Sequence, residues 1–265
     1  MCLILLAYNA HPSFQLILAA NRDEYYSRPS APAAFWENSP QILAGMDLKE
    51  GGTWLGLTRT GRIAAITNYR DPKSERKDAP SRGGLVSRFL SSSISAEDYL
   101  AFLRREEANF NGFNLIFGDM ERLFWFSNHS ALPEILEPGI HGLSNHLLDS
   151  PWPKVNQGKD ALKRLVDLGK NIKPDALFDI LSERTIAPDD LLPDTGVGIE
   201  LERLMSPIYI STPTYGTRSS TIILIDRNGE ATFIEKTFNG QQEKAKCVTF
   251  RFRIGEAPEE PSDSP

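Results

Sequence analysis

The first residue able to do chemistry is Cys2, which follows the initiator methionine and precedes the apolar run "LILLAY". Methionine aminopeptidase removes Met1 before a small residue, so we expect the mature chain to begin at Cys2. An α-amine titrates near pH ~8 in model peptides, so much of it is neutral and basic at cellular pH. Cys2 would then carry a nucleophilic thiol beside its own general base, as in enzymes with an N-terminal nucleophile. The alternative is a packing role, because free cysteine is among the most buried residue types.

Further polar residues stand where apolar runs end. The "NRDE" at residues 21–24 closes a run that we expect to pair beside Cys2, while Asn68 closes "RIAAITN" and Asn145 closes "GIHGLSN". Arg218 precedes a strongly apolar strand. An asparagine is a neutral donor for a developing oxyanion, and an arginine can hold a carboxylate or lower the pKa of a nearby thiol. The alternative for each is a turn, a backbone cap or a structural ion pair.

Motifs for other kinds of chemistry are missing from the sequence. The stretch "EGGTWLG" lacks both the lysine of a phosphate-binding loop and the spacing of a dinucleotide-binding motif. No G-x-S-x-G nucleophile elbow occurs. The four histidines form no i, i+4 pair with a carboxylate, although His141 and His146 could share a loop and bind zinc. We therefore expect no resident metal and no cofactor.

Composition limits the classes of partner and compartment. The 265-residue chain is 40% apolar and 24% charged, as in an ordinary soluble globular protein. A net charge of −6 argues against a nucleic-acid or anionic-membrane partner, which would favour a basic face. Only Cys2 and Cys247 are cysteines, so no disulfide framework is expected. The run Leu3–Ala7 is too short for a signal peptide or a membrane span, and we expect no integral membrane association and a cytoplasmic location.

Strands with short turns must position these residues. Residue patterns and turn signals predict strands over Cys2–Tyr8, Gln15–Ala20, Thr53–Thr58, Arg62–Asn68, Phe113–Gly118, Leu123–Ser127, Ile208–Ser211, Thr221–Asp226, Ala231–Phe238 and Lys246–Arg253. Helices are predicted over Ser81–Ser91, Ser95–Asn109, Lys154–Gly169 and Asp175–Arg184. Residues Tyr25–Pro40, rich in Pro and Ser, are predicted as an ordered surface loop. The acidic, proline-rich residues 255–265 are predicted as a disordered tail.

The order of these elements predicts the fold class. Strands are followed by helices, then by strands, helices and strands again, which favours two antiparallel sheets with helices on the outside. We therefore predict an α+β protein, a four-layer αββα sandwich, in one domain over residues 1–254.

Seven ordered stretches together resemble the NRDE family, also called the transport and Golgi organisation 2 family. They are "MCLILLAY", "LILAANRDEYYSRPS", "GGTWLGLTRTGRIAAITNYRDP", "SRGGLVSRFL", "NGFNLIFGD", "GLSNHLLDSPWPKV" and "YGTRSSTIILID". That family is grouped with the N-terminal nucleophile hydrolases, so the resemblance implies the same αββα sandwich. Its eukaryotic members are associated with Golgi organisation, secretion, lipid handling and haem trafficking.

A more distant similarity to choloylglycine hydrolases and penicillin V acylases implies a mechanism. Those enzymes also begin Met-Cys and carry an Arg-Asn-x-Asp motif at the end of their second strand. By that comparison Cys2 resembles the nucleophile and Asp23 the carboxylate that orients its amine. Asn68 and Asn145 resemble the oxyanion-hole pair, and Arg218 resembles a late arginine.

One departure from those enzymes concerns the motif's arginine. They place arginine before asparagine, whereas here the order is Asn21-Arg22-Asp23. Because side chains alternate between the two faces of a strand, Arg22 could point away from Cys2. Arg22 is therefore a candidate catalytic residue whose direction only a structure can settle.

The resemblance implies a hydrolase with an N-terminal cysteine. It would cleave an amide or thioester bond of a small acyl compound through a thioester on Cys2. The alternative is a non-catalytic protein that holds haem or a lipid in the same pocket, with Cys2 or a histidine as a ligand. The expected partner is thus a small acyl substrate or, on the alternative, haem or a lipid.

Overall fold

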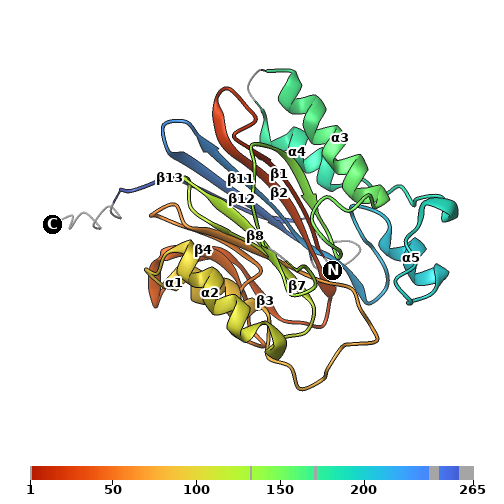
Figure 1. Cartoon of the computed structure of the whole chain (residues 1–265). Coiled ribbons are helices and arrows are strands. Elements are labelled where there is room, and N and C mark those ends of the chain that lie inside the picture. Colours follow the sequence, from red (N-terminus) through yellow and green to blue (C-terminus); the bar gives the residue numbers. More distant parts are fainter. Residues whose placement is uncertain (1, 132, 170–171, 239–244, 257–265) are drawn as a thin grey trace.

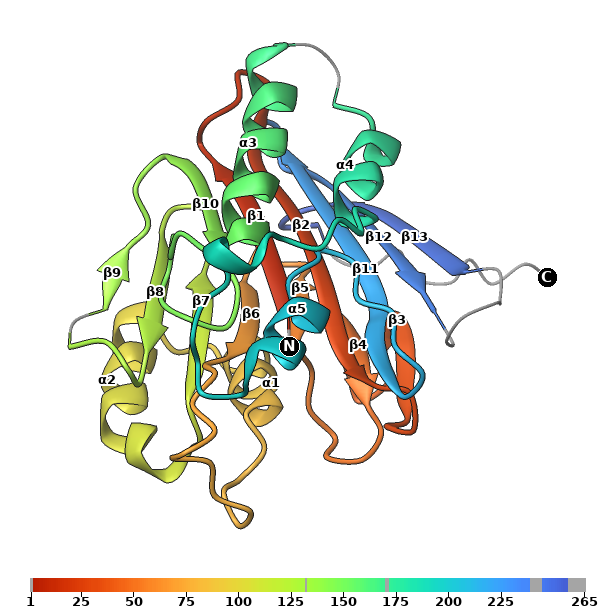
Figure 2. The same cartoon turned by 90° about the vertical axis from the view of Figure 1, so that its right-hand side faces the viewer.

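Two β-sheets lie face to face, and helices cover both outer faces in the computed structural model (Figure 1). The structure describes residues 2–131, 133–169, 172–238 and 245–256. One helical pair covers one sheet and a second pair covers the other, and the turned view in Figure 2 shows the same layers. These pairs are α1 (Gly83–Ser91) with α2 (Ala96–Glu106), and α3 (Pro153–Asp167) with α4 (Pro174–Leu181). The predicted four-layer αββα sandwich is therefore confirmed.

The first sheet contains the N-terminal strand and has the order β10-β1-β2-β11-β12-β13. Its strands are β1 (Cys2–Tyr8), β2 (Phe14–Tyr25), β10 (Gly139–Leu143), β11 (Tyr215–Asp226), β12 (Glu230–Thr237) and β13 (Lys246–Arg253). Every pairing in it is antiparallel. Cys2 pairs with Arg22, and Ile4 pairs with Leu143. The beginning of β1, the end of β2 and the end of β10 therefore lie together at one end of the sheet's strands.

The second sheet has the order β3-β4-β5-β6-β7-β8-β9 and is also antiparallel throughout. Its strands are β3 (Ser30–Trp36), β4 (Ser39–Asp47), β5 (Leu55–Thr58), β6 (Ile63–Asn68), β7 (Phe113–Gly118), β8 (Leu123–Ser127) and β9 (Glu134–Ile135). Strand β6 ends at Asn68, and a long loop then leads to α1. Asn68 lies at the same end of the molecule as Cys2, and both residues line one cavity.

Three apolar layers hold the four layers of backbone together. Between the sheets, Ile4 and Leu18 pack with residues such as Leu57. Leu3, Leu5 and the adjacent residues of β2 pack instead against α3 and α4. The outer face of the second sheet packs on α1 and α2. Because β1 and β2 are covered on both faces, the apolar layers fix which side chains can reach the space between the sheets.

Strand alternation assigns the polar residues of the motif to opposite faces. Cys2 shares its face with Ile4, which lies between the sheets. Asn21 lies on the opposite face, where its side-chain amide donates to the backbone carbonyls of Leu181 and Ile208 at 2.8 and 2.9 Å. Asn21 therefore has a structural role, tying β2 to the end of α4.

Several predicted elements are confirmed and others are wrong. Strands β1, β7 and β8 have the predicted bounds, and Ser95 caps α2 by accepting a hydrogen bond from the Asp98 N–H at 3.0 Å. The loop predicted over Tyr25–Pro40 is wrong, because β3 and the start of β4 occupy it. The strand predicted over Ile208–Ser211 is also wrong, since only an isolated bridge from Ser211 to Gly216 forms there. Most of the predicted tail, residues 257–265, lies outside the described residues.

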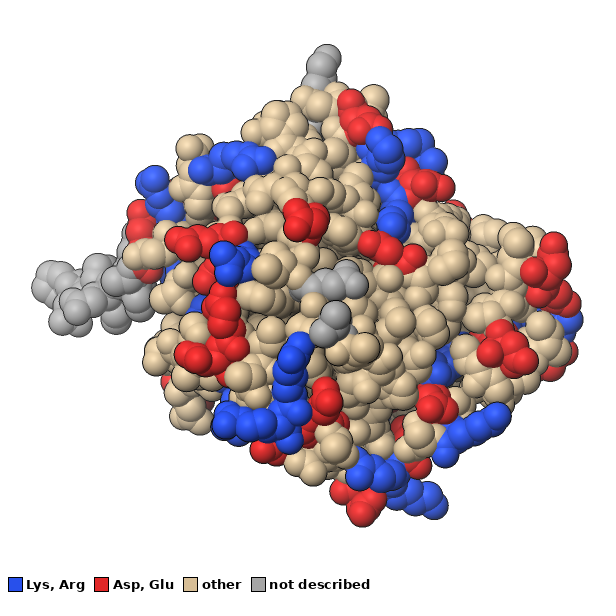
Figure 3. Space-filling view, in the orientation of Figure 1, with Lys and Arg blue, Asp and Glu red and all other residues tan. Residues whose placement is uncertain are grey.

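The surface carries charge of both signs. On the face shown in Figure 3, Lys and Arg side chains are interspersed with Asp and Glu. Among the described residues, no helix is both long and apolar enough to span a membrane. An additional short helix, α5 (Ile199–Met205), was not predicted from the sequence, and Lys154 at the start of α3 donates to its Met205 carbonyl.

Candidate active site

Cys2 lines a cavity of about 510 Å³ at the end of the sheet where these strand ends lie together. This volume lies within the range typical of small-molecule sites. The walls come from β1, the end of β2, residues 47–54, the end of β6 and the 72–83 loop. Cys2 is half-buried. Of the predicted site residues, Arg22, Asp23 and Asn68 line the same cavity.

Asp23 is a buried carboxylate held by hydrogen bonds from β11. It is 2% exposed, and Thr217 Oγ1 donates to its Oδ1 at 2.7 Å. The phenol of Tyr215 donates to the Asp23 backbone carbonyl at 3.0 Å. Burial raises the pKa of the Asp23 carboxyl, while the positive charge of Lys154 and the Thr217 hydrogen bond lower it. A carboxylate in this setting attracts a cation, as an amine-orienting residue must.

Burial and neighbouring charges both shift the pKa of the Cys2 thiol. Burial raises the pKa of the Cys2 thiol, and the negative charge of Asp23 raises it further. A hydrogen bond from the Asp23 backbone N–H and the charge of the Arg22 guanidinium lower that pKa. The surroundings therefore keep the thiol protonated until a nearby base accepts its proton.

A chain of hydrogen bonds joins Cys2 to both asparagines. The Ser144 hydroxyl lies 3.0 Å from the Cys2 carbonyl oxygen and 3.2 Å from Asn145 Oδ1, and it can donate to either. Asn145 Nδ2 donates to the Asn68 backbone carbonyl at 2.8 Å. Asn145 is fully buried, whereas Asn68 is exposed to the cavity. The two asparagines are therefore in contact, and of the two only Asn68 is in the cavity lining.

Arg22 faces the cavity. It pairs directly with Cys2 across β1 and β2, so both side chains emerge on the same face. The guanidinium lies 4.2 Å from the centre of the Trp54 ring, a cation–π contact. Arg22 is only 6% exposed. The expectation that alternation could turn Arg22 away from Cys2 is therefore corrected by the strand register.

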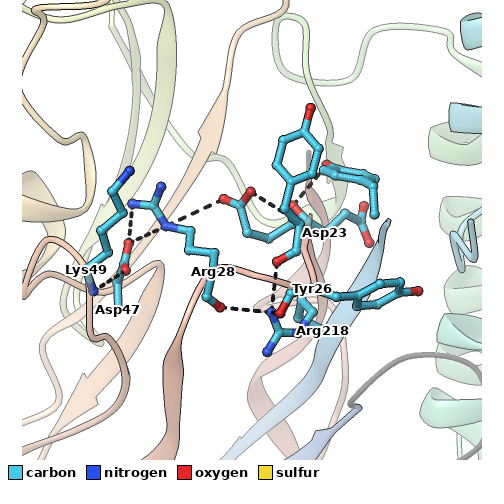
Figure 4. Close-up of polar contacts among 9 residues, drawn as sticks. Asp23, Tyr26, Arg28, Asp47, Lys49 and Arg218 are labelled. Atoms are coloured by element: carbon cyan, nitrogen blue, oxygen red, sulfur yellow. Dashed lines mark hydrogen bonds and ion pairs between the residues drawn. The ribbon is translucent and has the colours of Figure 1, made fainter. Parts of the chain in front are cut away.

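Arg218 lies apart from the cavity lining, at a bulge in β11. The register slips between Thr217 and Ser219, so Arg218 is the extra residue. Its Nη1 donates to the backbone carbonyls of Tyr25, Tyr26 and Arg28 at 2.9–3.1 Å (Figure 4). In this position Arg218 fixes the turn that follows β2. A catalytic role for Arg218 stays a prediction.

Three residues near the site were not singled out from the sequence. Lys154, on α3, is 2% exposed and donates to the Met205 carbonyl at 2.9 Å. Burial lowers the pKa of Lys154 to about 8, although the charge of Asp23 opposes this shift. Arg82 lines the cavity and donates to the Gly112 carbonyl at 2.9 Å. Thr217 stands in the "GTRSS" stretch, whose run of small hydroxyl residues inside a strand was the available signal.

His141, His146 and Cys247 are not among the residues that line the cavity. His141 Nδ1 lies 2.8 Å from Asp149 Oδ2 in a surface ion pair, and His146 contacts the Ser150 hydroxyl. Within the described ranges, no three His, Cys, Asp or Glu side chains gather as a metal site would require. Cys247 is exposed on the edge strand β13.

Comparison with solved structures identifies the fold. An N-acylethanolamine-hydrolyzing acid amidase ortholog from Caenorhabditis elegans is 11% identical with a TM-score of 0.51, covering 84% of this chain and 92% of that one. A mutant of the conjugated bile acid hydrolase from Clostridium perfringens is 10% identical with a TM-score of 0.52, covering 96% and 98%. This likeness shows that the chain shares the fold of these two enzymes.

Comparison of sequences identifies the family. The Transport and Golgi organization protein 2 homolog of Bos taurus is 37% identical over 275 residues, covering 96% of this chain and 99% of the relative. The homolog of Homo sapiens is 40% identical over 258 residues, covering 89% and 93%. The profile of the family described as Transport and Golgi organisation 2 matches residues 1–240. The chain therefore belongs to the Transport and Golgi organisation 2 family.

Proposed function

We propose that the protein is a hydrolase that uses Cys2 as its nucleophile to cleave an amide or thioester bond of a small acyl compound. The observation that carries the proposal is the meeting of Cys2, Asp23 and Asn68 on one cavity large enough for such a substrate. The structural neighbours support it, because one is described as an acid amidase and another as a bile acid hydrolase.

The reaction begins when Met1 is removed and the α-amine of Cys2 becomes free. Asp23, buried beside the start of β1, orients this amine, and its negative charge stabilises the ammonium that forms when the amine takes up a proton. The neutral amine accepts the thiol proton as sulfur attacks the substrate carbonyl, and a C–S bond forms. This proton transfer is needed because burial raises the pKa of the thiol.

The tetrahedral oxyanion is stabilised by donors at the end of β6. Asn68 lines the cavity, and Asn145 fixes its backbone by binding the Asn68 carbonyl. The collapse of the intermediate breaks the bond to the leaving amine or thiol, which receives the proton from the α-ammonium. Water, deprotonated by the same amine, then attacks the Cys2 thioester and the C–S bond breaks. The carboxylic acid is released, and the α-ammonium returns its proton to the Cys2 sulfur. Losing one preorganised oxyanion donor costs ~10²–10³ in rate.

The test is turnover of chromogenic p-nitroanilides and thiophenyl esters of acetic to octanoic acids. Wild-type protein should release product, and Cys2→Ala should abolish the release. Cys247→Ala is the matched control, because that thiol is exposed on an edge strand far from the cavity lining, and it should keep full activity. Turnover that survives in Cys2→Ala would contradict the proposal. An inactive wild type that shows a Cys2-dependent Soret shift with haem would support the binding alternative.

A further inference from the structure

We propose that the substrate of the Cys2 site carries an anionic group, a carboxylate or an equivalent oxyanion, which the Arg22 guanidinium receives. This inference rests on the proposed function, since it names the substrate class of the same cavity. Its basis is a buried cation for which the described residues supply no carboxylate within ion-pair distance and no hydrogen-bond acceptor for Nη1.

Arg22 is a desolvated charge facing an open cavity. Its side chain is 6% exposed, and its Nη1 is buried without a hydrogen-bond partner. Within the described ranges, no carboxylate oxygen lies within ion-pair distance of its guanidinium. A buried charge left unpaired is strongly destabilising. Proteins keep such groups at functional sites, where a ligand supplies the missing partner.

Three carboxylates feel the charge of Arg22, and each is bound to other groups. Asp23 accepts from the Thr217 hydroxyl at 2.7 Å. Asp47 accepts from Arg28 at 2.5 and 2.9 Å and from the Lys49 backbone N–H at 3.0 Å (Figure 4). Glu235 accepts from the Ala33 N–H at 2.7 Å and from the Thr221 hydroxyl at 3.2 Å. None of these carboxylates can turn to Arg22 without losing its bonds. The Arg22 guanidinium therefore remains available to an anion in the cavity that Arg22 lines.

The Trp54 ring limits where the guanidinium can lie. The Trp54 ring lies under it at 4.2 Å. The ring itself sits against Gly45, where a Cβ would come within 2.5 Å of two ring carbons, so only glycine leaves room. A planar guanidinium fixed by stacking presents its N–H groups as a fork that matches a carboxylate in two parallel hydrogen bonds. Lysine in the same place would supply charge without that fork.

A second role for Arg22 must be separated from this one. The guanidinium charge also lowers the pKa of the Cys2 thiol, so an Arg22 variant is expected to slow the reaction of every substrate. Anion recognition differs because it changes the affinity for charged ligands selectively. Equilibrium binding to a protein that cannot react distinguishes the two roles.

The experiment measures binding to Cys2→Ala protein by calorimetry with two matched ligand pairs. N-hexanoylglycine and its neutral glycinamide place the carboxylate on the amine side of the scissile bond. The monoamide and the diamide of suberic acid place it on the acyl side. In at least one pair, the anion should bind about tenfold or more tightly, the range expected for hydrogen bonds to a charged group. The pair that shows the preference identifies the side that carries the anion.

Variants then assign the preference to one side chain. Adding Arg22→Gln should remove the preference by weakening the anion alone, and Arg22→Lys should restore part of it. Arg82→Gln is the matched control, because Arg82 lines the same cavity but already donates to the Gly112 carbonyl, and it should keep the preference. Equal affinity within both pairs, or binding of neither member, would overturn the inference. A preference that Arg22→Gln leaves intact would also overturn it.

Failure of the inference and failure of the proposed function give different results. An Arg22-dependent preference without any turnover by the wild type would keep the anion site and reject hydrolysis. Turnover by the wild type, with equal affinity for charged and neutral ligands, would keep hydrolysis and reject the anion site.

Discussion

Thr217 is the residue through which β11 controls the charge of Asp23. Its hydroxyl donates to Asp23 Oδ1 at 2.7 Å and accepts from the Ile210 N–H at 3.0 Å, and the side chain is 1% exposed. Thr217→Val keeps the shape and removes both bonds. A hydrogen bond to a charged group contributes about 1.5–3 kcal/mol, and a buried N–H left unsatisfied costs about 1–3 kcal/mol. Because the site can relax, we expect the free energy of unfolding to fall by about 3 kcal/mol.

The same substitution should move the pH dependence of activity. The Thr217 hydrogen bond lowers the pKa of Asp23, so its loss raises that pKa and the carboxylate becomes protonated at a higher pH. The acid limb of the kcat/KM profile should therefore shift upward. Urea unfolding and pH–rate profiles of Thr217→Val and the hydroxyl-retaining control Thr217→Ser test this. The reasoning fails if the two variants unfold alike, or if the acid limb stays in place in Thr217→Val.

Three further predictions concern Lys154, Asn145 and the two thiols. Burial lowers the pKa of Lys154 to about 8, so between pH 8 and ~10.4 the unfolded chain binds more protons than the folded chain and the free energy of unfolding rises with pH. Lys154→Met should remove up to about 3 kcal/mol of that rise. If urea unfolding of wild type and variant gave the same dependence of the free energy on pH, the prediction would be refuted. Asn145→Ala should lower kcat by ~10²–10³ and the free energy of unfolding by ~1–3 kcal/mol, because the Asn145 amide holds the Asn68 carbonyl. Unchanged activity would show that Asn145 is a structural cap. Substoichiometric iodoacetamide should label Cys247 first while Met1 is retained, and Cys2 first once Met1 is removed. Asp23→Asn should slow the labelling of Cys2. Peptide mapping that finds Cys247 labelled before Cys2 in the mature chain would contradict this.

The sequence predicted those parts of the fold whose apolar pattern is uninterrupted. Strands β1, β7 and β8 are buried along their length, and their apolar runs mark both ends. Strand β3 was missed because it contains Pro32 and exposed residues. It lies at the edge of its sheet, where proline is tolerated because no ladder bond is lost there.

Polar residues inside buried strands account for the other errors. The predicted strand Thr221–Asp226 omitted the first half of β11, because Thr217 and Ser220 are hydroxyl residues. Both are nevertheless buried, and they are bonded to Asp23 and Asn21. The direction of Arg22 depends on strand register, which alternation alone does not provide. Lys154 was missed because lysine is almost never fully buried unless paired.

The central claim is that a free N-terminal Cys2 forms a thioester with its substrate. The direct measurement is rapid acid quench of Cys247→Ala protein during turnover of a hexanoyl thiophenyl ester, followed by mass spectrometry of the intact chain and its peptides. The account predicts a chain that begins at Cys2 and carries one hexanoyl group on the N-terminal peptide, absent from Cys2→Ala. A chain that retains Met1 in most molecules, or that carries no hexanoyl group on Cys2 while product accumulates, would contradict it.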